Sequence, residues 1–130
     1  MIEPVRFNLL VGWTVMVAGA LSGAAIGMFF HNEQWMGGYT SLRRRMARLG
    51  HISFFGLGII NVLFALSIAT ISVPISYGRF ASAGFAIAAL AMPACCFLTA
   101  WRPGFRYLFP IPVIAVLCGL GGLIGGWLRV

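Results

Sequence analysis

Residues 43–55 read RRRMARLGHISFF, and this stretch passes from a basic segment directly into an apolar one. Four of the nine positive charges of the chain lie in its first six residues. The apolar run that follows, residues 50–72, contains no charged side chain. A helix of this length crosses about 30 Å of hydrocarbon at about 1.5 Å per residue. The stretch therefore predicts a transmembrane helix that begins beside a cationic loop.

The composition extends this prediction to the whole chain. Of its 130 residues, 61% are hydrophobic and 8% are charged, whereas soluble domains have about 25% charged residues. The apolar runs that are long enough to cross a bilayer are residues 8–30, 50–72, 80–100 and 109–128. Short links between consecutive spans favour antiparallel neighbours. We predict an all-α, integral membrane four-helix up-down bundle with short loops, forming a single transmembrane domain over residues 1–130.

The first span has some features of a secretory signal peptide. Arg6 precedes an apolar segment at residues 9–17, and residues 18–20 (AGA) are small, as at a cleavage site. We expect the segment to be retained as a helix of the mature protein.

The distribution of arginines predicts the orientation in the membrane. Six arginines lie in the first and third connections and three at the opposite side. Positive residues are enriched in cytoplasmic loops. We therefore expect a cytoplasmic loop at residues 31–49 and both termini outside, with a bacterial inner membrane as the location.

The formal net charge of +7 does not indicate a nucleic-acid partner. The arginines gather at the ends of apolar runs, where they anchor helices and contact anionic lipid. Cys95, Cys96 and Cys118 all lie inside apolar runs, and we expect them to behave as small hydrophobic residues.

Small and amide side chains within the spans predict helix–helix contacts. Gly19, Gly23 and Gly27 follow one another at steps of four in the first span, and Gly121 and Gly125 form such a pair in the fourth. Such spacing lets two helix backbones approach closely. Asn61, near the middle of the second span, is expected to form hydrogen bonds between helices. The alternative is that it lines a pore or a quinone pocket.

The two histidines are the candidate ligands of a cofactor. His31 ends the first span and His51 begins the second, so an antiparallel pair would place them at similar depth on faces that carry glycine. Two such imidazoles could ligate haem b or a metal ion, with Arg44 and Arg48 pairing the haem propionates. The alternative is a pair of interfacial histidines without a ligand, since a zinc site would need three or four ligands.

These features favour a non-enzymatic membrane subunit. The spans carry none of the carboxylates that proton-coupled exporters of this size use, and no nucleophile–base pair is evident. The leading hypothesis is a small subunit of a larger respiratory or electron-transfer complex, with His31 and His51 ligating haem b or bordering a quinone or lipid site. The alternatives are a homo-oligomeric channel or transporter and a structural or assembly subunit without a cofactor. The expected partners are the lipid bilayer and either other membrane subunits or further copies of the chain.

Overall fold

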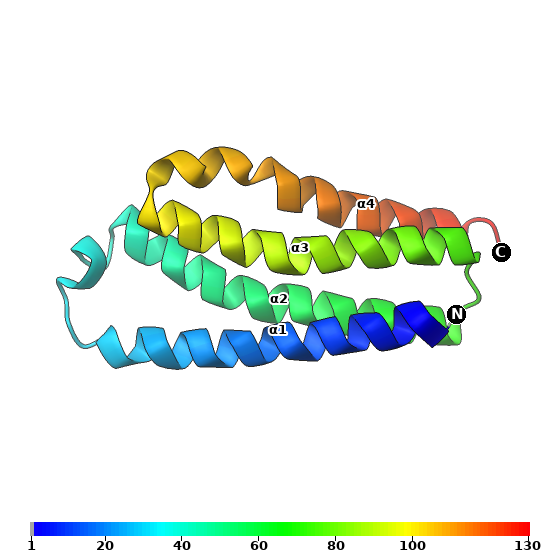
Figure 1. The fold of residues 1–130 in the computed structure, drawn as a ribbon, viewed down its shortest axis with the longest axis horizontal. Helices are drawn as coiled ribbons and strands as arrows, with labels where there is room; N and C mark the ends of the chain where they lie inside the picture. Colours follow the sequence, from blue (N-terminus) through cyan, green and yellow to red (C-terminus); the bar gives the residue numbers. More distant parts are fainter. Residues whose placement is uncertain (1) are drawn as a thin grey trace.

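The computed structural model describes residues 2–130 as four long helices joined by short connections (Figure 1). The helices are α1 (Ile2–Phe29), α2 (Leu42–Thr70), α3 (Ile75–Trp101) and α4 (Pro110–Trp127), and the 3-10 segments are η1 (Trp35–Gly37) and η2 (Pro103–Leu108). All four helices are long and apolar enough to cross a membrane. The predicted all-α membrane bundle is confirmed, and the chain is an integral membrane protein.

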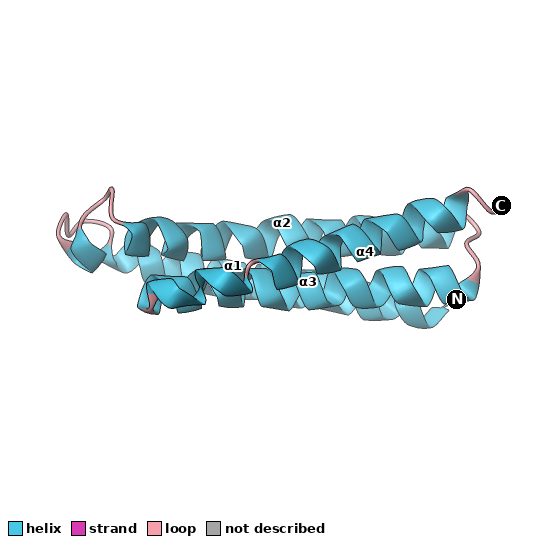
Figure 2. Ribbon diagram, turned by 90° about the horizontal axis from the view of Figure 1, so that it is seen from above, coloured by secondary structure: helices cyan, strands magenta, loops and turns pink. Residues whose placement is uncertain are grey.

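The helices run antiparallel in chain order. Figure 1 shows both termini and the α2–α3 connection at one end, and η1 with η2 at the other. The view turned by 90° shows all four helices following the long axis (Figure 2). Helix α2 packs along α1 and α3, whereas α4 packs chiefly on α3. Much of the surface of α1 and α4 is consequently free to contact lipid.

Capping determines where α2 begins, eight residues before the apolar run predicted as the second span. The Ser41 hydroxyl accepts a hydrogen bond from the Arg44 N–H at 3.2 Å, and it donates to the Met36 carbonyl at 2.7 Å. An N-cap satisfies a backbone donor that the first helical turn leaves open. The arginines of the loop therefore form the first turns of α2.

The turn before this cap needs left-handed backbone. Gly37 and Gly38 have φ angles of 86° and 93°, and Met36 has φ 56°. Glycine adopts these angles without the steric cost of a Cβ. The glycine pair therefore allows the loop to fold back toward α1.

Small residues bring α3 and α4 into close contact. A Cβ placed at Gly84 would lie 2.7 Å from the carbonyl oxygen of Ala115 and 2.7 Å from the backbone nitrogen of Gly119. Membrane helices have no hydrophobic driving force toward each other, so such close packing supplies much of their attraction. Helix α3 continues through the buried Pro93 in this region.

Candidate functional site

His51 lies in the contact between α1 and α2, and its ring faces the backbone of α1. Its Nδ1 atom is 2.9 Å from the carbonyl oxygen of Gly19. A carbonyl oxygen can only accept, so Nδ1 carries the proton and donates it. In the tautomer with this proton, Nε2 is the hydrogen-bond acceptor. The Ser22 hydroxyl, which donates to the same carbonyl at 3.0 Å, also lies 3.5 Å from Nδ1.

The position of this ring depends on a missing side chain in α1. A Cβ placed at Gly23 would lie 2.9 Å from Nδ1 and 3.0 Å from Nε2 of His51. On the other side, the ring of Phe55 meets the imidazole edge-on, with 5.5 Å between ring centroids. The imidazole is thus held between the α1 backbone and an aromatic ring of its own helix.

His31 lies elsewhere. It follows the last residue of α1, Phe29, and its side chain is exposed. Gly23, which is level with His51, precedes Phe29 by six residues, or about 9 Å of helix. The two imidazoles are therefore at different depths, because His51 packs more than one helical turn inside the end of α1.

The contact between α1 and α2 is close along α1 from Gly12 to Gly23. A Cβ at Gly19 would lie 2.9 Å from the ring of Phe55, and one at Gly12 would lie 2.7 Å from the carbonyl oxygen of Gly58. A porphyrin inserted between α1 and α2 would have to separate these contacts. Haem ligation by both histidines therefore stays a prediction that the packing does not favour. Within residues 2–130, no three His, Cys, Asp or Glu side chains gather as a metal site.

Arg44 is buried, with 2% of its surface exposed. Its Nη2 donates to the carbonyl oxygen of Phe30 at 3.1 Å, and its Nη1 donates to those of Asn32 and Glu33 at 3.3 Å each. The final carbonyls of a helix have no partner within it, and a cation also interacts favourably with that end of the helix dipole. Arg44 therefore ties the start of α2 to the residues that follow α1.

Aromatic rings surround the same guanidinium. The carbon Cζ of Arg44 lies 4.7 Å from the ring centre of Phe30, 5.6 Å from that of Trp35 and 5.4 Å from that of Tyr39. The Tyr39 ring also contacts Arg48, whose Cζ lies 4.4 Å from the ring centre. The guanidinium of Arg44 is thus already bonded to the loop between α1 and α2. The pairing of haem propionates by Arg44 and Arg48 stays a prediction.

A buried polar network joins α1, α2 and α3. Asn8 and Asn61 have 0% exposure. The Asn8 amide nitrogen donates to the amide oxygen of Asn61 at 2.7 Å, and the Ser82 hydroxyl donates to the amide oxygen of Asn8. The Asn61 amide nitrogen donates to the carbonyl oxygens of Leu57 at 2.8 Å and Phe85 at 3.1 Å. The network is satisfied within the chain.

Asn61 therefore forms interhelical hydrogen bonds, as expected. Its donor Asn8, and Ser82 that in turn donates to Asn8, were missed because these pairs are 53 and 74 residues apart in the sequence. The available signal was the presence of single polar side chains inside apolar runs.

The candidate packing glycines divide into two groups. A Cβ placed at Gly19 would meet Phe54 and Phe55, and one at Gly23 would meet His51. A Cβ at Gly125 would lie 3.2 Å from the Tyr77 ring. A Cβ at Gly27 or Gly121 would meet no atom within 4 Å. Gly27 lies where the chain leaves α1, and Gly121 is on an exposed face of α4. These two are not contact positions within the chain.

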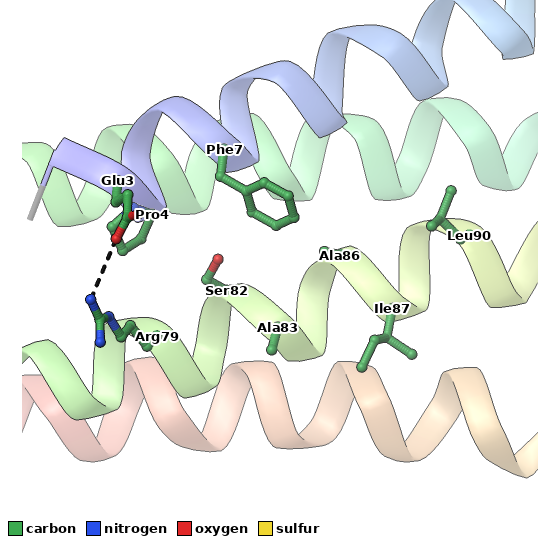
Figure 3. Close-up of a pocket in the computed structure, with 9 residues that line it drawn as sticks. All are labelled: Glu3, Pro4, Phe7, Arg79, Ser82, Ala83, Ala86, Ile87 and Leu90. Carbon is green, nitrogen blue, oxygen red and sulfur yellow. Dashed lines mark hydrogen bonds and ion pairs between the residues drawn. The ribbon is translucent and has the colours of Figure 1, made fainter.

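A groove of about 520 Å³ lies between α1 and α3, at the end that carries the termini (Figure 3). It is lined by Glu3, Pro4 and Phe7 of α1 and by Arg79, Ser82, Ala83, Ala86, Ile87 and Leu90 of α3. At its mouth, Arg79 Nη2 lies 3.4 Å from a carboxylate oxygen of Glu3. The remaining lining is mostly apolar.

Comparisons of the chain with protein-family models, with curated proteins and with solved structures find no match.

Proposed function

We propose that this protein is a small subunit of a larger electron-transfer complex in the membrane, where His51 borders a site for a quinone or a lipid headgroup. The observation that carries the proposal is the imidazole of His51, fixed by the Gly19 carbonyl at the start of an apolar span. Ionisable side chains inside membrane segments cost free energy, so those that are present usually have a function.

The chemistry of this site follows from the tautomer. Because Nδ1 donates to Gly19, the lone pair of Nε2 on His51 is available to accept a hydrogen bond from a hydroxyl or ammonium group. His51 follows Arg48 by three residues, about 4.5 Å along the helix. A molecule with a polar head and an apolar tail would have its head at this depth.

The role of a subunit is supported by how little of α4 is used within the chain. Helix α4 packs chiefly on α3, and its exposed side chains include Ile114, Leu117 and Ile124. Lipid or a neighbouring membrane helix can cover this surface. Reactive side chains are also scarce, since the spans contain no carboxylate and Cys95 and Cys96 are buried.

The test is purification of the tagged protein in mild detergent, followed by native electrophoresis, quinone extraction and an absorption spectrum. We expect a species larger than the chain, with redox proteins and bound quinone. Exchange of His51→Ala should reduce the quinone content, whereas His31→Ala, in the exposed position after α1, should not. A protein that migrates alone and without quinone contradicts the proposal. A Soret band that His51→Ala removes would restore the haem alternative.

A further inference from the structure

We propose that the groove between α1 and α3 binds one phospholipid whose headgroup carries both a phosphate and a primary ammonium group, as in phosphatidylethanolamine. The groove lies at the end of the bundle opposite His51, so this proposal does not depend on the proposed function. It assigns the phosphate to Arg79, the ammonium to Glu3 and one acyl chain to the apolar wall below them.

The length of the groove matches one leaflet. Along α3 its lining runs from Arg79 to Leu90. These eleven steps of helix correspond to about 16 Å. Half of the hydrocarbon core of a bilayer is about 15 Å. A chain that enters beside the charged pair would therefore end near the middle of the membrane.

The walls suit an acyl chain. The α3 residues of the lining recur at steps of three and four, so they form one face of the helix. Ala83 and Ala86 keep this face shallow, and Phe7 covers it from α1 (Figure 3). In Figure 3, α1 rises away from α3 to the right of Phe7, toward the Leu90 end of the lining. The groove volume of about 520 Å³ lies within the range of about 300–1,000 Å³ for ligand sites.

Below the mouth, no described residue of the lining offers an unpaired polar group to a headgroup. Ser82 is the polar residue of this wall, and its hydroxyl donates to the amide oxygen of Asn8. An apolar tail can contact this wall without leaving a donor unpaired, whereas a quinone ring would find no new donor there.

The mouth carries one charge of each sign. The side chains of Arg79 and Glu3 are 65% and 86% exposed, and one pair of their atoms lies 3.4 Å apart. Exposed ion pairs of this kind contribute little, about 0–1 kcal/mol. Both groups can therefore turn toward a headgroup at low cost, Arg79 to its phosphate and Glu3 to its ammonium.

This charge pair also predicts which lipids bind less well. An anionic lipid such as phosphatidylglycerol would pair with Arg79 but would be repelled by Glu3. Phosphatidylcholine has a quaternary ammonium group, which has no N–H to donate to Glu3. We expect phosphatidylethanolamine to bind about tenfold more tightly than phosphatidylglycerol, with phosphatidylcholine between them.

The experiment is native mass spectrometry of the delipidated protein in detergent, titrated with the three lipids at equal acyl-chain length. The matched variants are Ala83→Leu, which fills the groove, and Ala94→Leu, at an exposed position of α3 outside the lining. We expect Ala83→Leu to weaken phosphatidylethanolamine binding about tenfold and Ala94→Leu to leave it unchanged. Glu3→Gln should leave the bundle folded and bring the affinities for phosphatidylethanolamine and phosphatidylglycerol close together.

Three results would overturn the proposal. One is equal binding of all three lipids by the unaltered protein. Another is binding that Ala83→Leu and Glu3→Gln leave unchanged. If Ala83→Leu instead breaks up an oligomer without affecting lipid, the groove belongs to a protein contact and the lipid proposal is wrong.

Discussion

The amide nitrogen of Asn8 in α1 donates to the amide oxygen of Asn61 in α2 at 2.7 Å, and neither side chain is exposed. Ser82 of α3 completes the network by donating to Asn8. In hydrocarbon, an amide that has lost its partner has no water to replace it. This relationship therefore specifies how three helices are aligned along their axes, which apolar side chains alone specify less strictly.

Exchange of Asn61→Ala should lower the free energy of unfolding by about 0.6–2 kcal/mol, the range measured for hydrogen bonds between membrane helices in folded proteins and model peptides. The reason is that Asn8 and the Phe85 carbonyl each lose a partner. Unfolding in mixed micelles by a denaturing detergent measures the effect. The control is Ser67→Ala, at an exposed hydroxyl. In the double variant Asn8→Ala/Asn61→Ala, a loss equal to the sum of the single losses would contradict a shared network.

Exchange of Gly23→Ala should destabilise the α1–α2 contact by about 1–3 kcal/mol, as overpacking does. The added Cβ would lie 3.0 Å or closer to both ring nitrogens of His51. Gly27→Ala is the matched control on the same helix, because its Cβ would meet no atom within 4 Å. We expect the stability of this control to be unchanged or up to about 1 kcal/mol higher, since alanine favours helix. Equal effects of the two exchanges would show that the His51 ring does not pack on Gly23.

Exchange of Arg44→Met should loosen the loop before α2. Three backbone carbonyls would lose their charged donor, and we expect a loss of about 1–3 kcal/mol. Limited proteolysis between residues 31 and 41, together with thermal unfolding, measures the change. Arg45→Met, at the next residue of α2, where the side chain is exposed, is the control. Cleavage at the same rate in both variants would contradict a loop held by Arg44.

Labelling should establish the orientation in the membrane. In a background in which Cys95, Cys96 and Cys118 are replaced by alanine, a single cysteine at Gln34 should be protected from a membrane-impermeant maleimide applied from outside. A cysteine at Val130 should react. The expectation follows from six arginines at the η1 and η2 end against three at the other. The reverse labelling pattern would invert the predicted topology.

The number and type of the helices could be predicted from the sequence because they depend on local properties. Runs of about 20 apolar residues without charge have one stable solution in lipid, the helix, which satisfies every backbone group within the segment. The helix ends were less predictable. Hydropathy placed the second span at residues 50–72, whereas α2 is Leu42–Thr70. The sequence offers Thr40 and Ser41 as N-cap residues before the arginines, and the structure uses Ser41.

The candidate site was less accessible to sequence reasoning. The glycine-bearing face opposite His51 was visible at residues 19, 23 and 27, but the spacing could not tell which glycine the imidazole covers. It covers Gly23, while Gly27 is open. The sequence predicted that Arg44 would bind an anionic group at the membrane surface. In the structure, Arg44 is buried beneath the loop that precedes α2. Periodicity gives the face of a helix, and it does not give the axial offset between two helices.

The sequence by itself determined that this chain spans a membrane as four helices with most of its arginines at one end. The reason is that the free energy of transferring side chains from water to lipid depends on the local composition of the chain. Only the tertiary structure decided that His31 and His51 lie at different depths. It also decided that Asn8 bonds to Asn61 and Ser82, and that Glu3 pairs with Arg79. These relationships join residues 53 to 76 positions apart, except for the histidines. They depend on how far each helix slides along its neighbour, which close packing at glycine determines.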